Sequence, residues 1–194
     1  RDRAAAGRAL LTAHPACNVI LCDDGLQHYR LQRDLEIAVV DGQRRFGNGW
    51  LLPAGPLREG LWRLRQVDAV VVNGGALVDG LAAQFQMRLN GTLLSNLRSG
   101  EKRPAAELMG LKLHALAGIG HPQRFFEHLH GLKLDFVAHV FPDHHAYRLE
   151  DLDWPDADAL VMTEKDAVKC AAFADERYWV LPVEADVDPA FGLE

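Results

Sequence analysis

Short apolar runs that end in Asp-Gly or Asn-Gly turns recur in the first part of the chain. Residues 18–22, 35–40 and 69–72 form three such runs, each followed by acidic or amide residues and glycine. Runs of this length bounded by turn residues are typical of buried strands, and the longer connections between them favour a parallel arrangement. The pattern predicts a parallel α/β sheet, in which functional groups usually lie at the carboxyl ends of the strands.

A second series of strands and helices is predicted beyond residue 110. We expect strands at 113–117, 136–141, 159–163 and 178–183, and helices at 123–132 and 166–173. Near the start of the chain, residues 4–13 are typical of the end of a helix that Pro15 stops. Residues 98–110 combine charged residues with Gly, Ser and Pro and indicate a linker. The sequence therefore predicts an α/β fold in two parts, residues 1–103 and residues 104–194.

Composition and charge exclude several classes of protein. The 194 residues are 48% apolar and 25% charged, which is ordinary globular usage, and no apolar run approaches the roughly 20 residues of a membrane span. The three cysteines form no paired spacing, which argues against a disulfide scaffold. Residues 1–97 carry a net charge of +2 and residues 98–194 carry −8. A nucleic-acid binder is usually basic, so no nucleic-acid partner is expected, although local arginines could still bind phosphate.

Two carboxylates follow the first predicted strand. Asp23 and Asp24 begin the segment 23–28 (DDGLQH), which ends at His28. A strand-end carboxylate pair suits hydrated Mg²⁺, which prefers one or two carboxylates together with substrate phosphates. An apolar run ending in Asp also resembles the Walker B element of P-loop enzymes. The structural alternative stays open, because Asp-Asp-Gly is a common turn and Asp can cap a following helix.

A loop rich in glycine and arginine follows the second predicted strand. Residues 42–59 include Arg44, Arg45 and Arg58, and they end at Glu59, a further candidate ligand for a metal or a ribose. Glycines let backbone amides approach an anion, and arginines bind phosphate through two parallel hydrogen bonds. Loops of this length within compact domains are usually functional or disordered. The alternative is an ordinary surface loop with solvated arginines.

Apolar residues at helical spacing overlap the end of this loop. Leu57, Leu61 and Leu64 recur every three or four residues, with Trp62 beside them and arginines around them. A basic helix that carries Trp and Leu can lie on an anionic membrane surface. The alternative is a short amphipathic helix packed against its own domain.

Histidines follow a strand predicted in the second half. The segment 141–147 (FPDHHAY) places His144 and His145 after an aspartate, a combination suited to acid–base chemistry or to phosphate binding. No H-E-x-x-H pattern occurs, so zinc is not favoured. Residues 118–123 carry only half of a dinucleotide fingerprint, and residues 163–166 are typical of a helix cap with a salt bridge.

Taken together, these motifs resemble the tetraacyldisaccharide 4′-kinase family of lipid A biosynthesis. Five segments occur in the family's order and span nearly the whole chain: 23–29 (DDGLQHY), 44–59 (RRFGNGWLLPAGPLRE), 118–122 (GIGHP), 141–147 (FPDHHAY) and 163–170 (TEKDAVKC). Each segment alone is a modest match, but five in order at similar spacing form a specific signal.

The resemblance implies an ATP-dependent kinase with Mg²⁺ at its site. Residues 1–103 would be the remainder of a P-loop kinase core domain, and residues 104–194 would be a smaller α/β domain. The enzyme would phosphorylate the 4′-hydroxyl of a lipid disaccharide at the cytoplasmic face of the bacterial inner membrane. This segment would be peripheral there and would meet an anionic membrane surface.

The resemblance also implies roles for individual residues. The catalytic residues would be Asp23, Asp24, His28, and the pair His144 and His145, of which one would reach the site from the second domain. The metal ligands would be Asp23, Asp24 and Glu59. The substrate would be bound by Gln27, Arg44, Arg45, Asn48 and Arg58.

The chain departs from the family pattern in one respect. Family members carry an apolar N-terminal anchor, a Walker A loop and a catalytic Asp upstream of these motifs, whereas no G-x-x-x-x-G-K-[ST] occurs in this chain. We therefore expect a C-terminal fragment that binds ATP poorly and transfers no phosphate by itself. The alternative functions are another P-loop-type small-molecule kinase and a non-catalytic α/β interaction module. A Rossmann oxidoreductase is a third, weakened by the missing glycine of the fingerprint.

Overall fold

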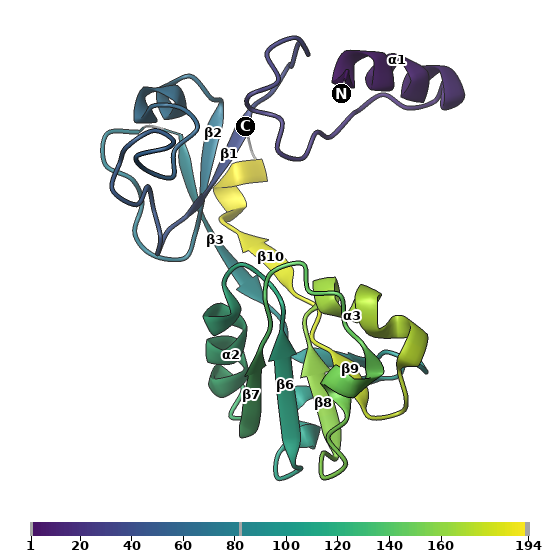
Figure 1. Ribbon diagram of the computed structural model, residues 1–194. Coiled ribbons are helices and arrows are strands. Elements are labelled where there is room, and N and C mark those ends of the chain that lie inside the picture. Colours follow the sequence, from purple (N-terminus) through teal and green to yellow (C-terminus); the bar gives the residue numbers. More distant parts are fainter. Residues whose placement is uncertain (1, 82, 193–194) are drawn as a thin grey trace. The chain divides into compact units, whose positions relative to one another are not determined.

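The chain forms two compact units, each described here by itself. The computed structural model describes residues 2–81 and 83–192 (Figure 1). The first unit comprises Arg1–Arg88 with Asp186–Glu194, and the second comprises Leu89–Ala185. The end of the chain therefore returns to the first unit. The boundary expected from the sequence, between residues 103 and 104, falls inside the second unit.

A four-stranded sheet organises the first unit. Its strands follow the order β1-β2-β3-β10, and β1, β2 and β3 are parallel. Val70 and Val72 of β2 pack against Ala38 and Val40 of β1 to form a small core. The elements of this unit are α1 (Arg3–Ala13), β1 (Ile37–Asp41), the 3₁₀ helix η1 (Leu61–Arg65), β2 (Ala69–Asn73), β3 (Gln84–Asn90), β10 (Glu184–Val187) and the 3₁₀ helix η5 (Pro189–Gly192). The strands predicted at 35–40 and 69–72 and the helix predicted at 4–13 are confirmed.

A six-stranded sheet organises the second unit. The order is β5-β4-β9-β8-β6-β7, in which β7, β6, β8 and β9 are parallel and β4 is antiparallel to both of its neighbours. The elements are β4 (Leu93–Asn96), β5 (Lys102–Pro104), the 3₁₀ helix η2 (Ala105–Leu108), β6 (Leu113–Ala117), α2 (Pro122–Gly131), β7 (Phe136–Val140), the 3₁₀ helix η3 (Leu149–Leu152), β8 (Ala159–Met162), α3 (Glu164–Cys170), the 3₁₀ helix η4 (Ala171–Phe173) and β9 (Tyr178–Val180). Every strand and helix predicted beyond residue 110 is present.

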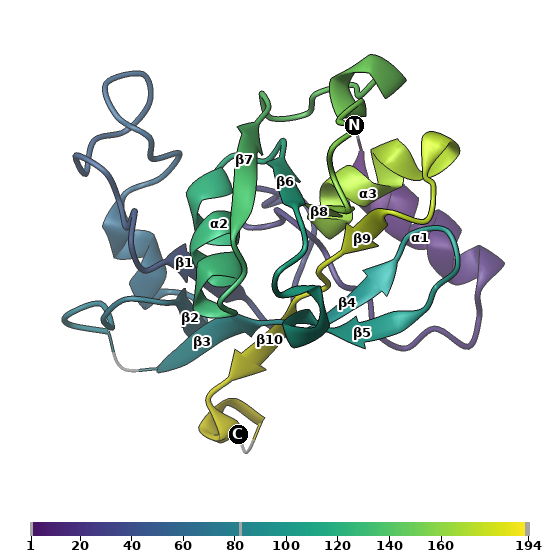
Figure 2. The same cartoon turned by 90° about the horizontal axis from the view of Figure 1, so that it is seen from below.

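Alternation along β6 explains how helices cover both faces of this sheet. Ala115 belongs to the core cluster that contains Phe125, Phe126 and Leu129 of α2. The next residue, Leu116, belongs to the cluster that contains part of α3. Because successive strand residues point to opposite faces, α2 and α3 lie on opposite sides of the sheet (Figure 2).

Residues 18–22 do not form a strand, and that prediction is wrong. The run has no regular secondary structure, and the side chain of Leu21 is 90% exposed. An apolar run becomes a strand only where a neighbouring strand binds its backbone N–H and C=O groups. Within residues 2–81 and 83–192, no strand pairs with this run. Asp23 and Asp24 therefore follow an irregular segment in this structure.

The segment expected to be a linker is part of the second unit. Residues 98–110 contain β5 and η2, and Ala105 and Leu108 are almost completely buried in the core. The charged residues that indicated a linker lie on the exposed strand β5, whereas the apolar residues after them face inward. No helix in the part of the chain that the structure describes has the length and hydrophobicity of a membrane span.

Cysteine reactivity offers a test of this packing. Cys170 is fully buried at the end of α3, and burial raises the pKa of its thiol to about 12. Cys22 is exposed. At about pH 8 we expect iodoacetamide to modify Cys22 readily in the folded chain, but Cys170 only after denaturation. Mass spectrometry of a variant with Cys17→Ser and Cys22→Ser would check this, and rapid native labelling of its one remaining thiol would contradict the packing.

A histidine pair predicts a pH dependence of the second unit. Nε2 of His139 lies 3.1 Å from Nδ1 of His114, and the His139 ring stacks on Trp154. Burial, and then the neighbouring His114, lower the pKa of His139. The unfolded chain therefore takes up this proton first, so the stabilisation is complete above about pH 6.5 and is lost as the pH falls below that value. We expect the melting temperature to drop on acidification, less steeply in His139→Gln than in the control His130→Gln.

Candidate functional site

The segment DDGLQHY forms a tight series of turns in the first unit. The backbone N–H of His28 donates to the carbonyl of Gly25 (2.9 Å), and the next turn is closed from Leu31 to His28 (2.9 Å). Arg33 reaches back and donates from Nη1 to the carbonyls of Gly25 (2.7 Å) and Leu26 (3.1 Å). These contacts fix the loop from within, so the side chains of this loop are held in defined positions.

A half-buried ionic network joins this loop to the region around η1. Glu36 accepts hydrogen bonds at 2.7 Å on both carboxylate oxygens from Arg63, and it lies 2.8 Å from Arg33. Tyr29 lies against both guanidinium groups, at 5.7 Å from that of Arg33 and 5.9 Å from that of Arg63. The Tyr29 hydroxyl donates to Glu59. The network therefore holds the end of the arginine loop beside the DDGLQHY segment.

Asp24 and Glu59, both predicted metal ligands, are each engaged by a polar neighbour. Arg58 binds Asp24 through two parallel hydrogen bonds, and this bonding lowers the pKa of the Asp24 carboxyl. Hydrogen bonds from Tyr29, and then from Gln27, lower the pKa of Glu59. Both carboxyl groups are therefore ionised at neutral pH.

A pocket of about 290 Å³ opens beside the same loop. Gln27 and His28 line it together with Arg3, whose guanidinium donates to the backbone carbonyl of Asp23 (2.8 Å). A cation, an imidazole and an amide thus converge on one hollow, which is a suitable arrangement for a phosphate-bearing ligand. The pocket contains two of the predicted site residues, Gln27 and His28.

The three predicted metal ligands do not converge. Among the residues that the structure describes, no group of three His, Cys, Asp or Glu side chains could hold a metal. Asp24 is bound by Arg58, Glu59 by Tyr29 and Gln27, and Asp23 contacts Arg3 only through its backbone carbonyl. Since Mg²⁺ needs only one or two carboxylates beside phosphate and water, the metal site remains a prediction.

The predicted substrate residues of the arginine loop have different local roles. The Asn48 amide donates to the Ala54 carbonyl (2.9 Å), and its oxygen accepts from the Trp50 N–H (3.1 Å). Arg45 donates to backbone carbonyls at positions 76 and 77. Arg44 is exposed, with no side-chain partner among residues 2–81 and 83–192. The structure therefore uses Asn48 and Arg45 to shape the loop and leaves Arg44 available to a ligand.

The helix expected around Leu57–Leu64 is shorter than predicted. Only Leu61–Arg65 is helical, as the 3₁₀ helix η1, whereas Leu57 forms a bridge with Leu51. Leu64 packs against the core of the first unit. Residues 57 and 64 therefore contact the protein itself, as the structural alternative required, and Leu61 and Trp62 remain exposed.

His144 and His145, in the second unit, occupy contrasting positions. Nε2 of His145 lies 3.0 Å from Asp151, and the ring is packed between Phe141 and Tyr147. His144 has a left-handed backbone (φ 63°) and a side chain that is 77% exposed. Its nearest charged partner is Asp143, at 3.7 Å. His145 is therefore a packed residue and His144 a free one.

A fully buried carboxylate ties together the turns at this edge of the second sheet. Asp166 accepts from the Gly118 N–H (3.0 Å) and from the Thr163 hydroxyl (2.7 Å), and Thr163 in turn caps α3. Gly118 must be glycine here, because a Cβ atom would lie 2.6 Å from the Tyr147 hydroxyl. The expected cap at residues 163–166 is confirmed, and the GIGHP turn is held by it rather than by a ligand.

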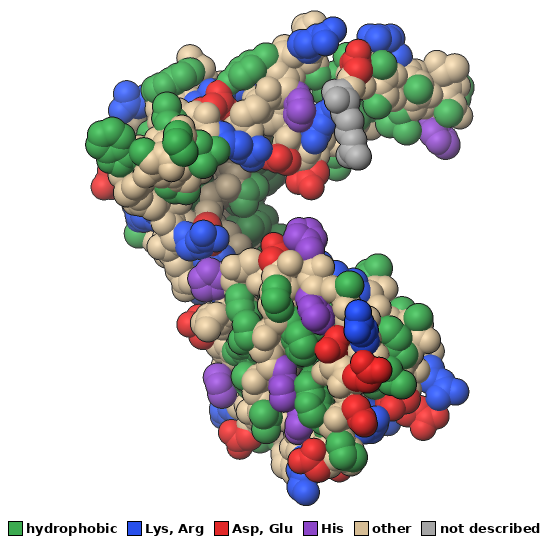
Figure 3. All heavy atoms as spheres, viewed as in Figure 1, with side chains coloured by type: hydrophobic (Ala, Val, Ile, Leu, Met, Phe, Trp, Pro, Cys, Tyr) green, Lys and Arg blue, Asp and Glu red, His purple; other side chains and the backbone are tan. Residues whose placement is uncertain are grey.

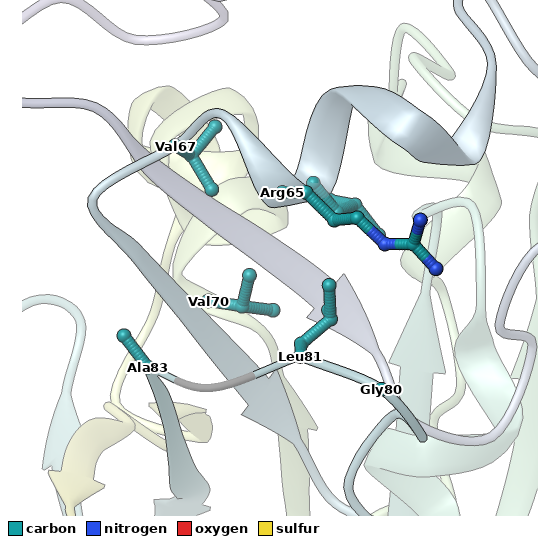
Figure 4. A pocket seen from close by; sticks show the side chains of 7 residues that line it. Arg65, Val67, Val70, Gly80, Leu81 and Ala83 are labelled. Carbon is teal, nitrogen blue, oxygen red and sulfur yellow. The ribbon is translucent and has the colours of Figure 1, made fainter.

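A second pocket of about 270 Å³ lies beside η1 and carries little chemistry. It is lined by apolar residues such as Val67, Val70 and Leu81 together with Arg65. Figure 4 shows the Arg65 guanidinium extending away from the two valines. With no converging polar groups, this pocket is not a candidate site.

Comparison with known proteins identifies the family. A family model described as tetraacyldisaccharide-1-P 4′-kinase matches residues 1–193. The chain belongs to this family. It is 52% identical over 191 residues to the tetraacyldisaccharide 4′-kinase of Methylobacillus flagellatus, and 50% identical over 193 residues to that of Nitrosococcus oceani. These alignments cover 98% and 100% of this chain but 56% of each relative.

A solved structure supports the same family assignment. The chain is similar to LpxK from Aquifex aeolicus, described as an "apo" form in complex with ATP, with a TM-score of 0.67 and 27% identity. The match covers 87% of this chain and 53% of that one. The expected α/β fold class is thus confirmed. The chain spans about half the length of the tetraacyldisaccharide 4′-kinases it matches.

Sequence reasoning missed the residues that support the site. Tyr29, Arg33, Glu36 and Arg63 were not singled out, although Tyr29 lies within a family segment. Glu36 and Arg63 are 27 residues apart, and no fixed spacing links them. A charged residue inside the predicted strand 35–40 was the one available signal, because a carboxylate there needs a partner.

Proposed function

We propose that the protein to which this chain belongs transfers a phosphoryl group from ATP to the 4′-hydroxyl of a tetraacyldisaccharide 1-phosphate. The observation that carries the proposal is the family match over residues 1–193, combined with the loop that holds Asp24, Gln27 and Glu59 together with Arg58. Phosphoryl transfer requires positioned phosphates, a neutralising cation and an oriented hydroxyl rather than covalent help from the protein. The residues of this loop supply groups of each of these kinds.

Asp24, Glu59 and Gln27 would hold Mg²⁺, together with phosphate and water. Both carboxyl groups are kept ionised by their hydrogen-bond donors, and Gln27 Oε1 has no hydrogen-bond partner in the structure. Carboxylate and amide oxygens are the hard ligands that Mg²⁺ prefers, so this donor set fits the ion. When bound, the ion would neutralise charge that develops on the phosphoryl oxygens.

Arg58 and Arg44 would bind the phosphates of the reactants. The guanidinium of Arg58 already makes two parallel hydrogen bonds to the carboxylate of Asp24. The same planar group fits two phosphate oxygens equally well, so an arriving phosphate could take over Arg58 and leave Asp24 available to the ion. His28 lines the pocket beside this loop and would contact the ligand there.

His144, rather than His145, would be the histidine of the second unit that reaches the reacting groups. The His145 imidazole is occupied by Asp151 and enclosed by aromatic rings, whereas the His144 side chain is exposed on a strained backbone. Strained conformations of this kind persist where the surroundings fix them, and they cluster at functional sites. Asp143, which accepts the backbone N–H of His144 (3.0 Å) and binds Lys165, would hold the segment in place.

The cytoplasmic face of the bacterial inner membrane would be the place of action, because the substrate is a lipid. The protein would be peripheral through this segment, with the arginine loop toward the anionic surface. The chain spans about half of its relatives and contains no Gly-rich Lys-Ser/Thr phosphate loop. We therefore expect ATP binding and transfer in the complete protein, and little of either in the 194 residues alone.

Product analysis would test the proposal. The complete protein is incubated with ATP, Mg²⁺ and either the tetraacyldisaccharide 1-phosphate or the same disaccharide without acyl chains. The expected product is the lipid carrying a second phosphate at its 4′ position. Transfer to the soluble sugar but not to the lipid would favour a small-molecule kinase, and failure to bind Mg²⁺-ATP would favour an interaction module.

A further inference from the structure

The arginine loop ends in an exposed apolar tip. Trp50, Leu51 and Leu52 are consecutive in the sequence, and their side chains are 66%, 49% and 62% exposed. Every residue from Gly47 to Ala54 is exposed. Figure 3 shows hydrophobic side chains, with arginine and lysine side chains among them, over the loops beside β1 and β2. Three consecutive large apolar side chains facing solvent need an explanation, whereas single ones are ordinary.

The tip is ordered by its own hydrogen bonds. The carbonyl of Trp50 accepts from the Leu57 N–H (3.1 Å), and the N–H of Leu52 donates to the Leu57 carbonyl (2.8 Å). The Asn48 side chain closes the loop from the other side, through Trp50 and Ala54. A loop whose backbone groups are satisfied internally can leave water without losing hydrogen bonds. The apolar side chains are therefore presented by a preformed element.

The charges around the tip are almost all positive. Residues 42–65 contain five arginines and a single acidic residue, Glu59. Arg44 and Arg65 are exposed and have no partner among the residues that the structure describes. Arg45 binds only backbone carbonyls, so its charge is not neutralised. A surface that complements this arrangement carries negative charge above an apolar layer.

We infer that the tip Trp50–Leu52 inserts into an anionic lipid bilayer, with Arg44, Arg45 and Arg65 binding the headgroups. Trp and Leu on one side and arginine on the other are the composition of elements that lie in the membrane interface. The inference rests on the proposed function in one respect, since an enzyme with a lipid substrate must reach a membrane. It moves the contact from the Leu57–Leu64 segment, where two of the three leucines are engaged by the protein, to residues 50–52.

Flotation with vesicles would test the insertion directly. The 194-residue chain is mixed with vesicles of phosphatidylcholine alone or of phosphatidylcholine with phosphatidylglycerol, without ATP or lipid substrate. We expect binding to the anionic vesicles, and a shift of Trp fluorescence to shorter wavelength that Trp50→Phe removes. Trp50→Ser combined with Leu52→Ser should weaken partitioning at least about tenfold, and Arg44→Gln about fivefold.

Matched controls separate insertion from general effects. Val168→Ser removes an exposed apolar side chain from α3 in the second unit and should leave vesicle binding unchanged. The tip variants should melt at the wild-type temperature, because the side chains they remove are exposed. Equal binding by wild type and tip double variant would overturn the inference. It would equally fail if the tip supported self-association and no vesicle binding. Because the assay contains no nucleotide, failure of the kinase proposal would leave these results unchanged.

Discussion

Asp24→Asn in the complete protein is expected to lower the turnover of phosphoryl transfer at least about tenfold while the fold stays intact. The substitution removes the negative charge that Asp24 would offer to Mg²⁺ but retains an oxygen of similar position. Asp24 has a left-handed backbone (φ 49°), a conformation that Asn adopts as readily as Asp. Strain is therefore not introduced, and a loss of turnover would reflect the charge.

The readout for Asp24→Asn should include the dependence on Mg²⁺ as well as the rate. We expect the Mg²⁺ concentration for half-maximal activity to rise and the melting temperature to stay unchanged. Asp34→Asn is a matched control, because Asp34 is also exposed in the first unit but lies outside the DDGLQHY segment. Turnover and Mg²⁺ dependence like those of the wild type would remove Asp24 from the metal site.

Asp166→Ala is expected to destabilise the second unit by about 2–4 kcal/mol. The Asp166 carboxylate is fully buried and accepts the Gly118 N–H and the Thr163 hydroxyl. Without it, the buried N–H of Gly118 loses its acceptor, and the amino group of Lys169, 3.4 Å from the carboxylate, loses its counter-charge. In thermal unfolding this corresponds to a fall in melting temperature of roughly 5–15 °C.

Two further variants make the Asp166 result specific. Asp166→Asn keeps an oxygen for Gly118 but removes the charge, so we expect an intermediate effect. Asp135→Ala removes an exposed carboxylate from the same unit and should change stability by less than about 0.5 kcal/mol. Faster alkylation of Cys170, which lies on the same helix, would report local opening in Asp166→Ala. If Asp166→Ala melts like the control, the buried carboxylate does not hold the two turns together.

The fold was predictable where burial leaves a clear local pattern. The run 113–117 is buried at every position, and its predicted bounds are those of β6. Residues 18–22 carry a similar apolar signal but form no strand, because pairing depends on a neighbour that a local pattern does not reveal. The strands β3 and β10 were missed because they are partly exposed and rich in polar residues, so no apolar run marks them.

The site was predictable as a set of motifs but not as a set of contacts. The sequence singled out Asp24, Arg58 and Glu59, and the structure places Arg58 on Asp24 across 34 residues of chain. An ion pair of this kind is decided by tertiary packing, which carries no spacing rule. The supporting network of Glu36 and Arg63 was missed for the same reason. The resemblance to a family therefore added more to the candidate site than residue spacing did.

The most direct test of the account compares phosphoryl transfer by the complete protein and by the 194-residue chain. Both are given radiolabelled ATP, Mg²⁺ and the tetraacyldisaccharide 1-phosphate under the same conditions, and the lipid fraction is analysed for label. We expect the complete protein to place label on the 4′-hydroxyl and the 194-residue chain to transfer none. Absence of lipid labelling by the complete protein, or labelling by the 194-residue chain at a comparable rate, would contradict the account.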